Sequence, residues 1–405
     1  MPRSESKIRV GIVGLGLAAT PHAKGYAAHP DAEITAVCDL DGARARQFAD
    51  RFGALPVYSS FEEMLQAPGM NAVDIATPTY LHARMARQAA EAGMHVHCEK
   101  PFCRSVAEGE AACQAAEENG VTLAVGETYV FLSSHQKARE LIEAGEIGQP
   151  LQVRQRHGGW LARDRPAIPT GPADRGWRID PERSGGGKFP WIFDHAVHFF
   201  AAAECFLLDD PVSEVYALEA SQYRATERAG AAHDPYTSAE PDIPMIAWKH
   251  RSGRAQSVWT RAERLNGRYD YMRGFSTTIV GERGMIEVLG EGGGGLTFGE
   301  KPCHLILYRD SKETLTFRFE EGDDDVWQSD VCYYSQGHVN QIRSFVDSIL
   351  SGTPPRYTGE DGVRAVRCAL ATIVSAREGL PVKVTEVPKE LSAAALSDDG
   401  RGGLC

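Results

Sequence analysis

The sequence lacks the features that mark several protein classes. No stretch approaches the roughly 18 apolar residues that a membrane-spanning helix requires. The first seven residues carry no apolar segment of the kind found in signal peptides. The nine cysteines are odd in number and show no Cys-x-x-Cys pairing, which argues against a disulfide framework. We therefore expect a cytoplasmic protein with reduced thiols.

Positive charge is also scarce. The formal net charge is −12 and no run of basic residues occurs, which argues against nucleic acid or an anionic membrane as a partner. No internal repeat is apparent. The chain has 405 residues, of which 42% are hydrophobic and 24% charged, and this predicts two or three globular domains with a large core.

The most informative motif is a glycine turn near the start of the chain. An apolar strand from Lys7 opens into Gly14-x-Gly16-x-x-Ala19. The first glycine permits a tight turn, the second lets a phosphate approach the backbone, and the small third residue lets the helix pack on the strand. The helix N-terminus then faces the anion. We expect a dinucleotide site at Gly14, Leu15, Gly16, Leu17 and Ala18.

A second apolar strand, residues 33–39, ends in Asp39, 23 residues beyond Gly16. A carboxylate at this position accepts hydrogen bonds from the adenosine ribose hydroxyls and repels a 2′-phosphate, so NAD is favoured over NADP. Arg44 and Arg46 leave NADP as an alternative cofactor. The alternative is that Asp39 caps a helix expected at 41–52.

The first part of the chain alternates between apolar runs and helical stretches, which predicts a doubly wound parallel sheet, the Rossmann arrangement. The helix expected at 105–119 opens with a Ser105-x-x-Glu108 capping box. Further strands are expected at 72–76, 95–98 and 121–125, and a further helix at 80–92. Ligands bind beyond the carboxyl ends of such strands, and the residues that fall there are Gly14, Asp39, Thr77, Glu99, Lys100 and Glu127.

Beyond residue 131 the pattern changes. Strand-like runs without intervening helices predict an open-faced, mostly antiparallel sheet with helices on one face, in an α+β unit. The other face is free to meet another subunit. After a helix at 134–144, strands are expected at 151–157, 212–220, 245–249, 255–261, 276–280, 285–289 and 314–319, and closing helices at 337–350 and 359–378.

Lys100 lies in Glu99-Lys100-Pro101, directly after an expected strand, so it would point into the cofactor crevice. Positive charge on an oxidised nicotinamide would lower the pKa of this lysine and let it share in proton transfer. Its ammonium group could also hold a substrate hydroxyl. The alternative is a solvated lysine at a strand end.

A second constellation, Asp194-x-x-x-His198, follows three consecutive glycines at 185–187. If residues 191–203 are helical, the two side chains lie one turn apart, and the carboxylate can orient the imidazole. Histidine is the natural base for removing an alcohol proton. The alternatives are a core histidine, or a metal site formed by Asp194, His195, His198 and His157, although His195 points to another face. We expect no metal.

The order and spacing of these motifs resemble the oxidoreductase family of glucose-fructose oxidoreductase, inositol dehydrogenase and the rhizopine-catabolism protein. The resemblance covers roughly residues 7 to 385. The motifs that carry it are Gly14-x-Gly16-x-x-Ala19-x-x-His22, the segment from Ala76-Thr77-Pro78 to His82, Glu99-Lys100-Pro101, the triple glycine with Asp194-x-x-x-His198, and a hairpin signal from Gly281 to Gly284.

The resemblance implies an NAD-binding Rossmann domain at 1–130, a substrate-binding and oligomerisation domain at 131–388, and a loosely ordered tail at 389–405. It also implies homodimers or homotetramers formed through the second sheet. It identifies Lys100 as the catalytic lysine and Asp194 with His198 as the acid/base pair. Other positions match the cofactor lining (Thr77, Pro78, His82 and Glu99) and the substrate pocket (Tyr129, His157, Trp177 and Arg178).

These features predict NAD-dependent oxidation of a secondary hydroxyl on a sugar, cyclitol or related polyol. Two alternatives remain: a glycosidase or lyase that oxidises a ring carbon transiently, and a non-catalytic NAD-binding sensor. The chain departs from the family pattern in two places. The segment 158–184 is long and rich in Arg, Pro and Trp. It could form a lid, an oligomer arm, a contact for an acidic substrate or a plain surface loop. Pro190 and Trp191 replace smaller aliphatic residues.

Overall fold

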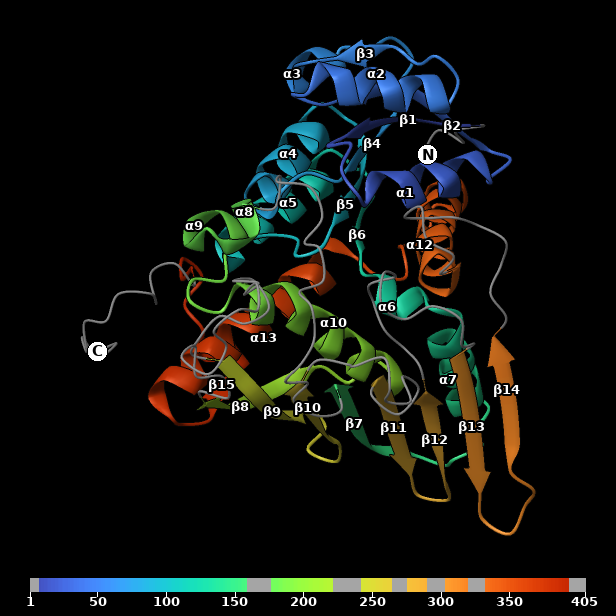
Figure 1. The fold of residues 1–405 in the computed structure, drawn as a ribbon, viewed down its shortest axis with the longest axis vertical. Helices are drawn as coiled ribbons and strands as arrows, with labels where there is room; N and C mark the ends of the chain where they lie inside the picture. Colours follow the sequence, from blue (N-terminus) through green and yellow to red (C-terminus); the bar gives the residue numbers. More distant parts are fainter. Residues whose placement is uncertain are drawn as a thin grey trace, which may run out of the picture.

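The computed structural model describes residues 7–158, 176–220, 242–263, 275–289, 303–319 and 332–392. They form two units, each built on one sheet, with helices between the sheets (Figure 1). Within these ranges, no helix combines the length and the apolar character needed to cross a bilayer.

The first unit is a six-stranded sheet in the order β3-β2-β1-β4-β5-β6, and every pairing is parallel. This confirms the predicted doubly wound arrangement. The strand order reverses between β1 and β4, so a ligand crevice is expected at the carboxyl ends of these strands. The strands are β1 (Ile8–Val13), β2 (Ala32–Cys38), β3 (Val57–Tyr58), β4 (Ala72–Ile75), β5 (His95–Glu99) and β6 (Leu123–Gly126). The helices are α1 (Ala19–Ala27), α2 (Gly42–Arg51), α3 (Phe61–Met64), α4 (Thr79–Glu91) and α5 (Val106–Glu118).

The start of α5 shows how local sequence sets the helix boundaries. Ser105 Oγ accepts a hydrogen bond from Glu108 N at 3.3 Å, as the capping-box pattern predicts. The Glu108 carboxylate instead accepts from Arg104 N at 3.0 Å, one residue before the expected position. A complete capping box, Thr358 with Asp361, begins a later helix, α13 (Gly359–Glu378).

The second unit is a nine-stranded sheet in the order β14-β13-β12-β11-β7-β10-β9-β8-β15. All pairings are antiparallel except that of β7 with β10. β13 was not predicted. The strands are β7 (Pro150–Gly158), β8 (Val212–Ala220), β9 (Asp242–His250), β10 (Gln256–Glu263), β11 (Phe275–Gly281), β12 (Gly284–Leu289), β13 (Cys303–Arg309), β14 (Leu315–Phe319) and β15 (Val382–Lys383).

Helices cover the face of this sheet that is turned toward the first unit, which confirms the open-faced arrangement (Figure 1). They are α7 (Ser133–Glu143), α10 (Pro190–Phe206) and α13, whereas α6 (Thr128–Phe131) contacts α10 and α12 (Cys332–Ser351), and α12 packs against α1 of the first unit. Three short elements are α8 (Gly176–Ile179), α9 (Pro181–Ser184) and η3 (Val384–Glu386). Beyond η3, Lys389 contacts α5 through its carbonyl oxygen, 2.9 Å from Ala107 N. Residues 393–405 of the predicted tail lie outside the described residues.

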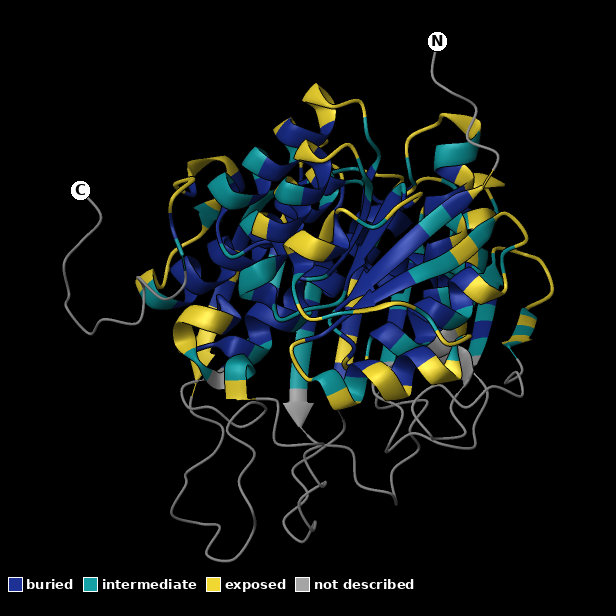
Figure 2. Cartoon of the chain, turned by 90° about the horizontal axis from the view of Figure 1, so that it is seen from above, coloured by how far each residue is buried: buried dark blue, intermediate teal, exposed yellow. Residues whose placement is uncertain are grey.

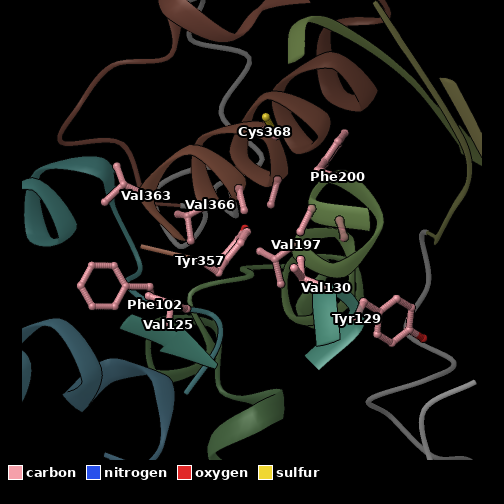
Figure 3. Packing of buried hydrophobic residues seen from close by; sticks show 14 of the residues in the cluster. Phe102, Val125, Tyr129, Val130, Val197, Phe200, Tyr357, Val363, Val366 and Cys368 are labelled. Carbon is pink, nitrogen blue, oxygen red and sulfur yellow. The ribbon is translucent and has the colours of Figure 1, made fainter. Parts of the chain in front are cut away.

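One apolar cluster runs through both units. In Figure 2 the central parallel strands are mostly buried, β2 and β3 are partly accessible, and exposed residues lie on the outer helices and loops. In Figure 3, side chains of α13, α10 and β6 meet around Tyr357, among them Val366, Val197 and Val125. Because this packing is continuous, the ends of the parallel strands are held in place against α10.

A buried polar network lies among α1, β4 and β5. His22 Nδ1 is 2.9 Å from Asp74 Oδ1, and His22 Nε2 is 3.1 Å from Glu99 Oε1. The second Asp74 oxygen accepts from the Tyr26 hydroxyl and pairs with His97 Nδ1, both at 2.9 Å. All five side chains are buried. We call this set the His22 network.

The network extends to α12, which comes from the far end of the chain. Gln341 Nε2 lies 3.0 Å from His22 Nε2 and 3.3 Å from His338 Nδ1. The Thr128 hydroxyl, at the start of α6, lies 3.2 Å from Gln341 Oε1. The network therefore ties α12 and α6 to the parallel sheet.

Charge pairing inside the network shifts its pKa values strongly. Burial opposes a charged His22, but the charge and hydrogen bond of Asp74, with those of Glu99, outweigh it and raise the His22 pKa to about 10. Burial opposes a charged Glu99, yet the hydrogen bond and charge of His22 lower the Glu99 pKa to about 2. The Asp74 pKa is also lowered, by His22 and His97 against burial. His22 is thus a buried cation between two carboxylates.

This pairing predicts a specific pH dependence of stability. The contribution of His22 is complete below its unfolded pKa of about 6.5 and is lost as the pH rises through about 10. We expect the free energy of unfolding, measured by urea titration, to fall over that range. In His22→Gln the decline should be largely absent, and near pH 6 the variant should be destabilised by about 3–5 kcal/mol, because a buried charge pair has lost one partner.

The matched control is His29→Gln, at the end of α1, where the histidine pairs with the exposed Asp347 at 3.1 Å. This variant should keep the wild-type decline. If His22→Gln also kept it, the assignment of the raised pKa to His22 would be wrong.

Candidate functional site

The glycine turn forms a cradle whose shape fits a pyrophosphate. Gly14 has φ +82°, and a Cβ there would lie 2.7 Å from Thr77 N, so only glycine is accommodated. A Cβ on Gly16 would meet nothing within 4 Å, so its backbone is open to a ligand. Among the described residues no side chain caps the first turn of α1 at Ala18, which leaves its N–H groups for an anion. Leu15 is buried and Leu17 is 46% exposed.

Asp39 lies beside this cradle at the end of β2. Its Oδ2 accepts from Leu15 N and its Oδ1 from Asp41 N, both at 2.8 Å. The alternative that Asp39 caps α2 is wrong, because the N-cap is Asp41, which accepts from Arg44 N and Ala43 N. Arg44 Nη1 is 3.6 Å from Asp39 Oδ2. The structure therefore places the carboxylate next to the glycine turn, with one arginine nearby.

His82 and Pro78 support the crevice from behind. The His82 ring nitrogens lie 2.7 Å from Pro101 O and 2.6 Å from Thr77 O, and the side chain is buried. Burial lowers the His82 pKa. Pro78 is the N-cap of α4. His82 therefore contacts the crevice indirectly, through the carbonyl oxygens of Thr77 and Pro101.

Lys100 crosses from the first unit to the second. Its Nζ lies 3.0 Å from the carbonyl oxygen and 3.1 Å from Oδ1 of Asp194 on α10. Arg178 Nη1, on α8, lies 2.7 Å from Asp194 Oδ2. The Lys100 side chain is only 13% exposed, so the alternative of a solvated lysine is wrong. One carboxylate holds two cations from different parts of the chain.

His198 has a different partner from the one predicted. Its Nδ1 pairs with Glu127 Oε1, at the end of β6, in a short contact. Asp194 is one helical turn away, but its carboxylate is taken by Lys100 and Arg178. Glu127, rather than the expected Asp194, therefore orients the His198 ring. The sequence placed Glu127 at the correct sheet edge, but the contact itself depends on how α10 packs.

The remaining predicted pocket residues come from three elements, and one of them contacts His198 directly. The Tyr129 ring stacks on His198 with centroids 4.4 Å apart. His157 is buried on β7, edge-on to Phe199 at 4.8 Å. On α8, the Arg178 guanidinium lies 4.8 Å from the Trp177 ring centroid. Residues 159–175 of the long segment lie outside the described residues.

The tight turn before α10 explains the glycine triplet. Gly185 has φ +82°, and a Cβ on Gly186 would lie 2.6 Å from Pro190 Cα. Pro190 occupies the first turn of α10, where proline is tolerated because no partner is needed for its missing N–H. The Trp191 ring stacks on His195 with centroids 4.4 Å apart. Helix α10 confirms the helix predicted around Asp194 and His198.

The metal set considered from the sequence is not assembled in the described part of the chain. His195 Nδ1 lies 3.1 Å from Trp191 O, the carbonyl of its own helix. The two groups with metal-ligand spacing among the described residues are elsewhere and share His22: His22 with Glu99 and His338, and His22 with Asp74 and His97. In both, imidazoles and carboxylates are already hydrogen-bonded to each other.

Comparison with known proteins places this geometry in context. Residues 8–127 match the profile described as "Oxidoreductase family, NAD-binding Rossmann fold". Residues 139–384 match "Oxidoreductase family, C-terminal alpha/beta domain". The chain is 36% identical over 383 residues to scyllo-inositol 2-dehydrogenase (NAD(+)) of Bacillus subtilis, covering 94% of this chain and 97% of that protein. It is 27% identical over 385 residues to myo-inositol 2-dehydrogenase of Thermotoga maritima, covering 94% and 99%.

Solved structures share the fold. Levoglucosan dehydrogenase in complex with NADH and levoglucosan superposes with a TM-score of 0.72 at 22% identity, covering 93% of this chain and 99% of that one. A probable dehydrogenase from Thermotoga maritima superposes with a TM-score of 0.66 at 23% identity, covering 94% and 100%.

The position of Asp39 makes cofactor preference testable. We expect Asp39→Ala to bind NADH at least about tenfold more weakly and to bind NADPH no worse, because a carboxylate at this position would accept from the ribose hydroxyls and repel a 2′-phosphate. Fluorescence titration with each cofactor measures both constants. Asp41→Ala removes the α2 cap and a 3.7 Å ion pair with Arg44 but leaves the Asp39 carboxylate in place, so it should keep the wild-type preference. An unchanged NADPH-to-NADH ratio in Asp39→Ala would remove Asp39 from cofactor selection.

Proposed function

Because the chain belongs to the oxidoreductase family with an NAD-binding Rossmann fold and a C-terminal alpha/beta domain, we propose that it oxidises a secondary hydroxyl of a sugar, cyclitol or related polyol. The observation that carries the proposal is the bridge from Lys100 to Asp194, since it brings the end of β5 against α10, the helix that holds His198. The names of two full-length relatives, both inositol dehydrogenases, support the substrate class.

The proposed reaction begins with the substrate hydroxyl at His198. Glu127 holds Nδ1 of the ring, so Nε2 is the nitrogen that accepts the hydroxyl proton. The Glu127 carboxylate then stabilises the imidazolium, and the stacked Tyr129 ring limits its rotation. Bound NAD supplies the hydride acceptor.

Lys100, held by Asp194, contacts the oxygen of the same substrate hydroxyl. The Lys100 ammonium group donates a hydrogen bond to the substrate oxygen and stabilises the negative charge that develops as the proton leaves. Asp194 holds that ammonium group through its carboxylate and its carbonyl oxygen. Because Lys100, Asp194 and His198 are each at most slightly exposed, these contacts act in a medium with little water screening.

The cofactor lining in this proposal consists of the glycine turn, Asp39 and the ends of β4 and β5. Gly14, Leu15, Gly16, Leu17 and Ala18 would bind the pyrophosphate, and Asp39 the adenosine ribose. Thr77, Pro78 and Lys100 would line the nicotinamide side. His82 and Glu99 would lie behind this lining and support it. Tyr129, His157, Trp177 and Arg178 would line the substrate pocket.

Two other activities fit the same residues. A glycosidase or lyase of this fold would oxidise a ring carbon, eliminate a leaving group and return the hydride, so it would release an aglycone without accumulating NADH. A sensor would bind NAD without turnover, which the joint presence of Lys100, Asp194 and His198 argues against. Absorbance of NADH during incubation with polyols and with glycosides separates the three.

We further propose that the protein forms homodimers or homotetramers through the open face of the second sheet. Tyr216, Leu218 and Met245 on β8 and β9 are 37–40% exposed there, and exposed apolar side chains favour association. Light scattering counts the subunits. We keep residues 1–130, 131–388 and 389–405 as the proposed division of the chain. A cytoplasmic location fits the free thiols of the described cysteines, such as Cys98 and Cys205.

Lys100→Ala and His198→Ala test the proposed chemistry. Each should lower kcat at least about 100-fold, because His198 accepts the hydroxyl proton and Lys100 stabilises the negative charge that develops on the oxygen. NADH affinity, measured by fluorescence, should stay near that of the wild type. Lys137→Ala, which removes a lysine paired with Glu140 on α7, is the control and should retain full activity. Wild-type rates in both site variants would exclude them from the mechanism.

Glu127→Gln tests the newly found partner of His198. The amide keeps the shape but cannot stabilise an imidazolium as the carboxylate does, so kcat should fall about 10- to 100-fold with little change in KM. Stopped-flow measurement of the first turnover reports the chemical step directly. Glu143→Gln, on the outer surface of α7 beside Arg139, is the matched control. A Glu127→Gln variant with unchanged kcat would show that the contact serves packing alone.

A further inference from the structure

The His22 network holds two carboxylates but a single positive charge. His22 Nδ1 faces Asp74 at 2.9 Å and His22 Nε2 faces Glu99 at 3.1 Å, so both ring nitrogens donate and the ring is an imidazolium. His97 places its Nδ1 against Asp74. Its Nε2 is buried without a hydrogen-bond partner among the described residues, which fits a neutral ring. One negative charge is therefore left uncompensated within the network.

Among the described residues, His22 is the one cation that pairs with Glu99. Burial would raise the Glu99 pKa, but the hydrogen bond and charge of His22 bring it to about 2, so the carboxylate is ionised. Burial, then the charge of His22, lower the His338 pKa to about 3, so that ring adds no charge. Lys100 follows Glu99 in the chain, but its ammonium group is held 3.1 Å from Asp194 Oδ1.

Glu99 lies in the half of the sheet that would take the nicotinamide. In a sheet with the order β3-β2-β1-β4-β5-β6, each half binds one nucleotide of the cofactor. Asp39, at the end of β2, marks the adenosine half, so the end of β5 belongs to the nicotinamide half. The Glu99 side chain is 11% exposed there, whereas Asp74 on β4 is fully buried. Within the network, the negative charge nearest to the crevice is therefore that of Glu99.

The two redox states of the cofactor differ in charge at the nicotinamide ring. The oxidised ring carries a positive charge and the reduced ring is neutral. A fixed carboxylate in surroundings with little water favours the charged ring, because a charge interaction over a few ångströms there exceeds what a roughly tenfold change in affinity requires.

We propose that Glu99 determines the redox-state specificity of the site, and that its carboxylate favours NAD over NADH. The inference needs NAD to bind, as the family profile indicates, and it does not depend on which hydroxyl is oxidised. Because the oxidised form is stabilised, bound NADH becomes a stronger hydride donor than it is without this carboxylate.

The affinities of Glu99→Gln for NAD and NADH test the proposal without any substrate. The amide keeps the shape of the side chain and an acceptor oxygen for His22, but removes the charge. NADH binding is followed by fluorescence, and NAD and ADP-ribose, which lacks the nicotinamide, are measured by displacement of NADH. NAD affinity should fall at least about tenfold relative to NADH affinity, while ADP-ribose affinity should change less than about twofold. Glu99→Asp keeps the charge and should retain most of the wild-type ratio.

Asp39→Ala is the matched control, because it removes a carboxylate from the adenosine half of the same crevice. It should weaken NAD and NADH by the same factor and leave their ratio unchanged. Glu99→Ala removes the same charge as Glu99→Gln and replaces it if the amide variant does not fold. A wild-type ratio in the variant without the charge would overturn the proposal. An equal loss of ADP-ribose affinity would also overturn it, since Glu99 would then act on the shape of the crevice. Because no substrate is present, this result is independent of the proposed oxidation of polyols.

Discussion

The buried ion pairing of His22 with Asp74 and Glu99 is the constraint on which the site depends. It lies directly behind the ends of β4 and β5, and Lys100 follows Glu99 in the chain without an intervening residue. Through Gln341 and Thr128 the same network reaches the start of α6, next to Glu127. Lys100 and Glu127, at the two ends of the proposed site, are thus anchored by one charged cluster, in which carboxylates and imidazoles compensate one another.

The site is assembled by contacts between residues far apart in the sequence. Lys100 meets Asp194 across 94 positions and Glu127 meets His198 across 71. Each contact joins the parallel sheet to α10, and the apolar packing around Tyr357 holds the same elements together. The proposed proton transfer would therefore depend on the packing between the two units as much as on any single side chain, since a small displacement of α10 would separate both pairs.

The sequence predicted the elements well because their signals are local. The glycine turn, the alternation of strands and helices, and the capping serine at 105 each concern a few neighbouring residues. It could not predict that Asp194 pairs with Lys100 while Glu127 pairs with His198, because helical spacing alone allows the Asp194–His198 contact and only tertiary packing decides between the partners. The strand β13 was not predicted because its apolar run is short and lies between His304 and Tyr308.

Helix α12 carries a consequence for how the molecule is made. Gln341 contacts a histidine that lies 319 residues earlier, and α12 packs against α1 (Figure 1). A ribosome releases the whole parallel sheet long before it synthesises this helix. The nascent cofactor-binding unit therefore holds an unfinished charge cluster and an uncovered helix face until α12 emerges. The charge cluster behind the site is complete only after residues from both units have been synthesised.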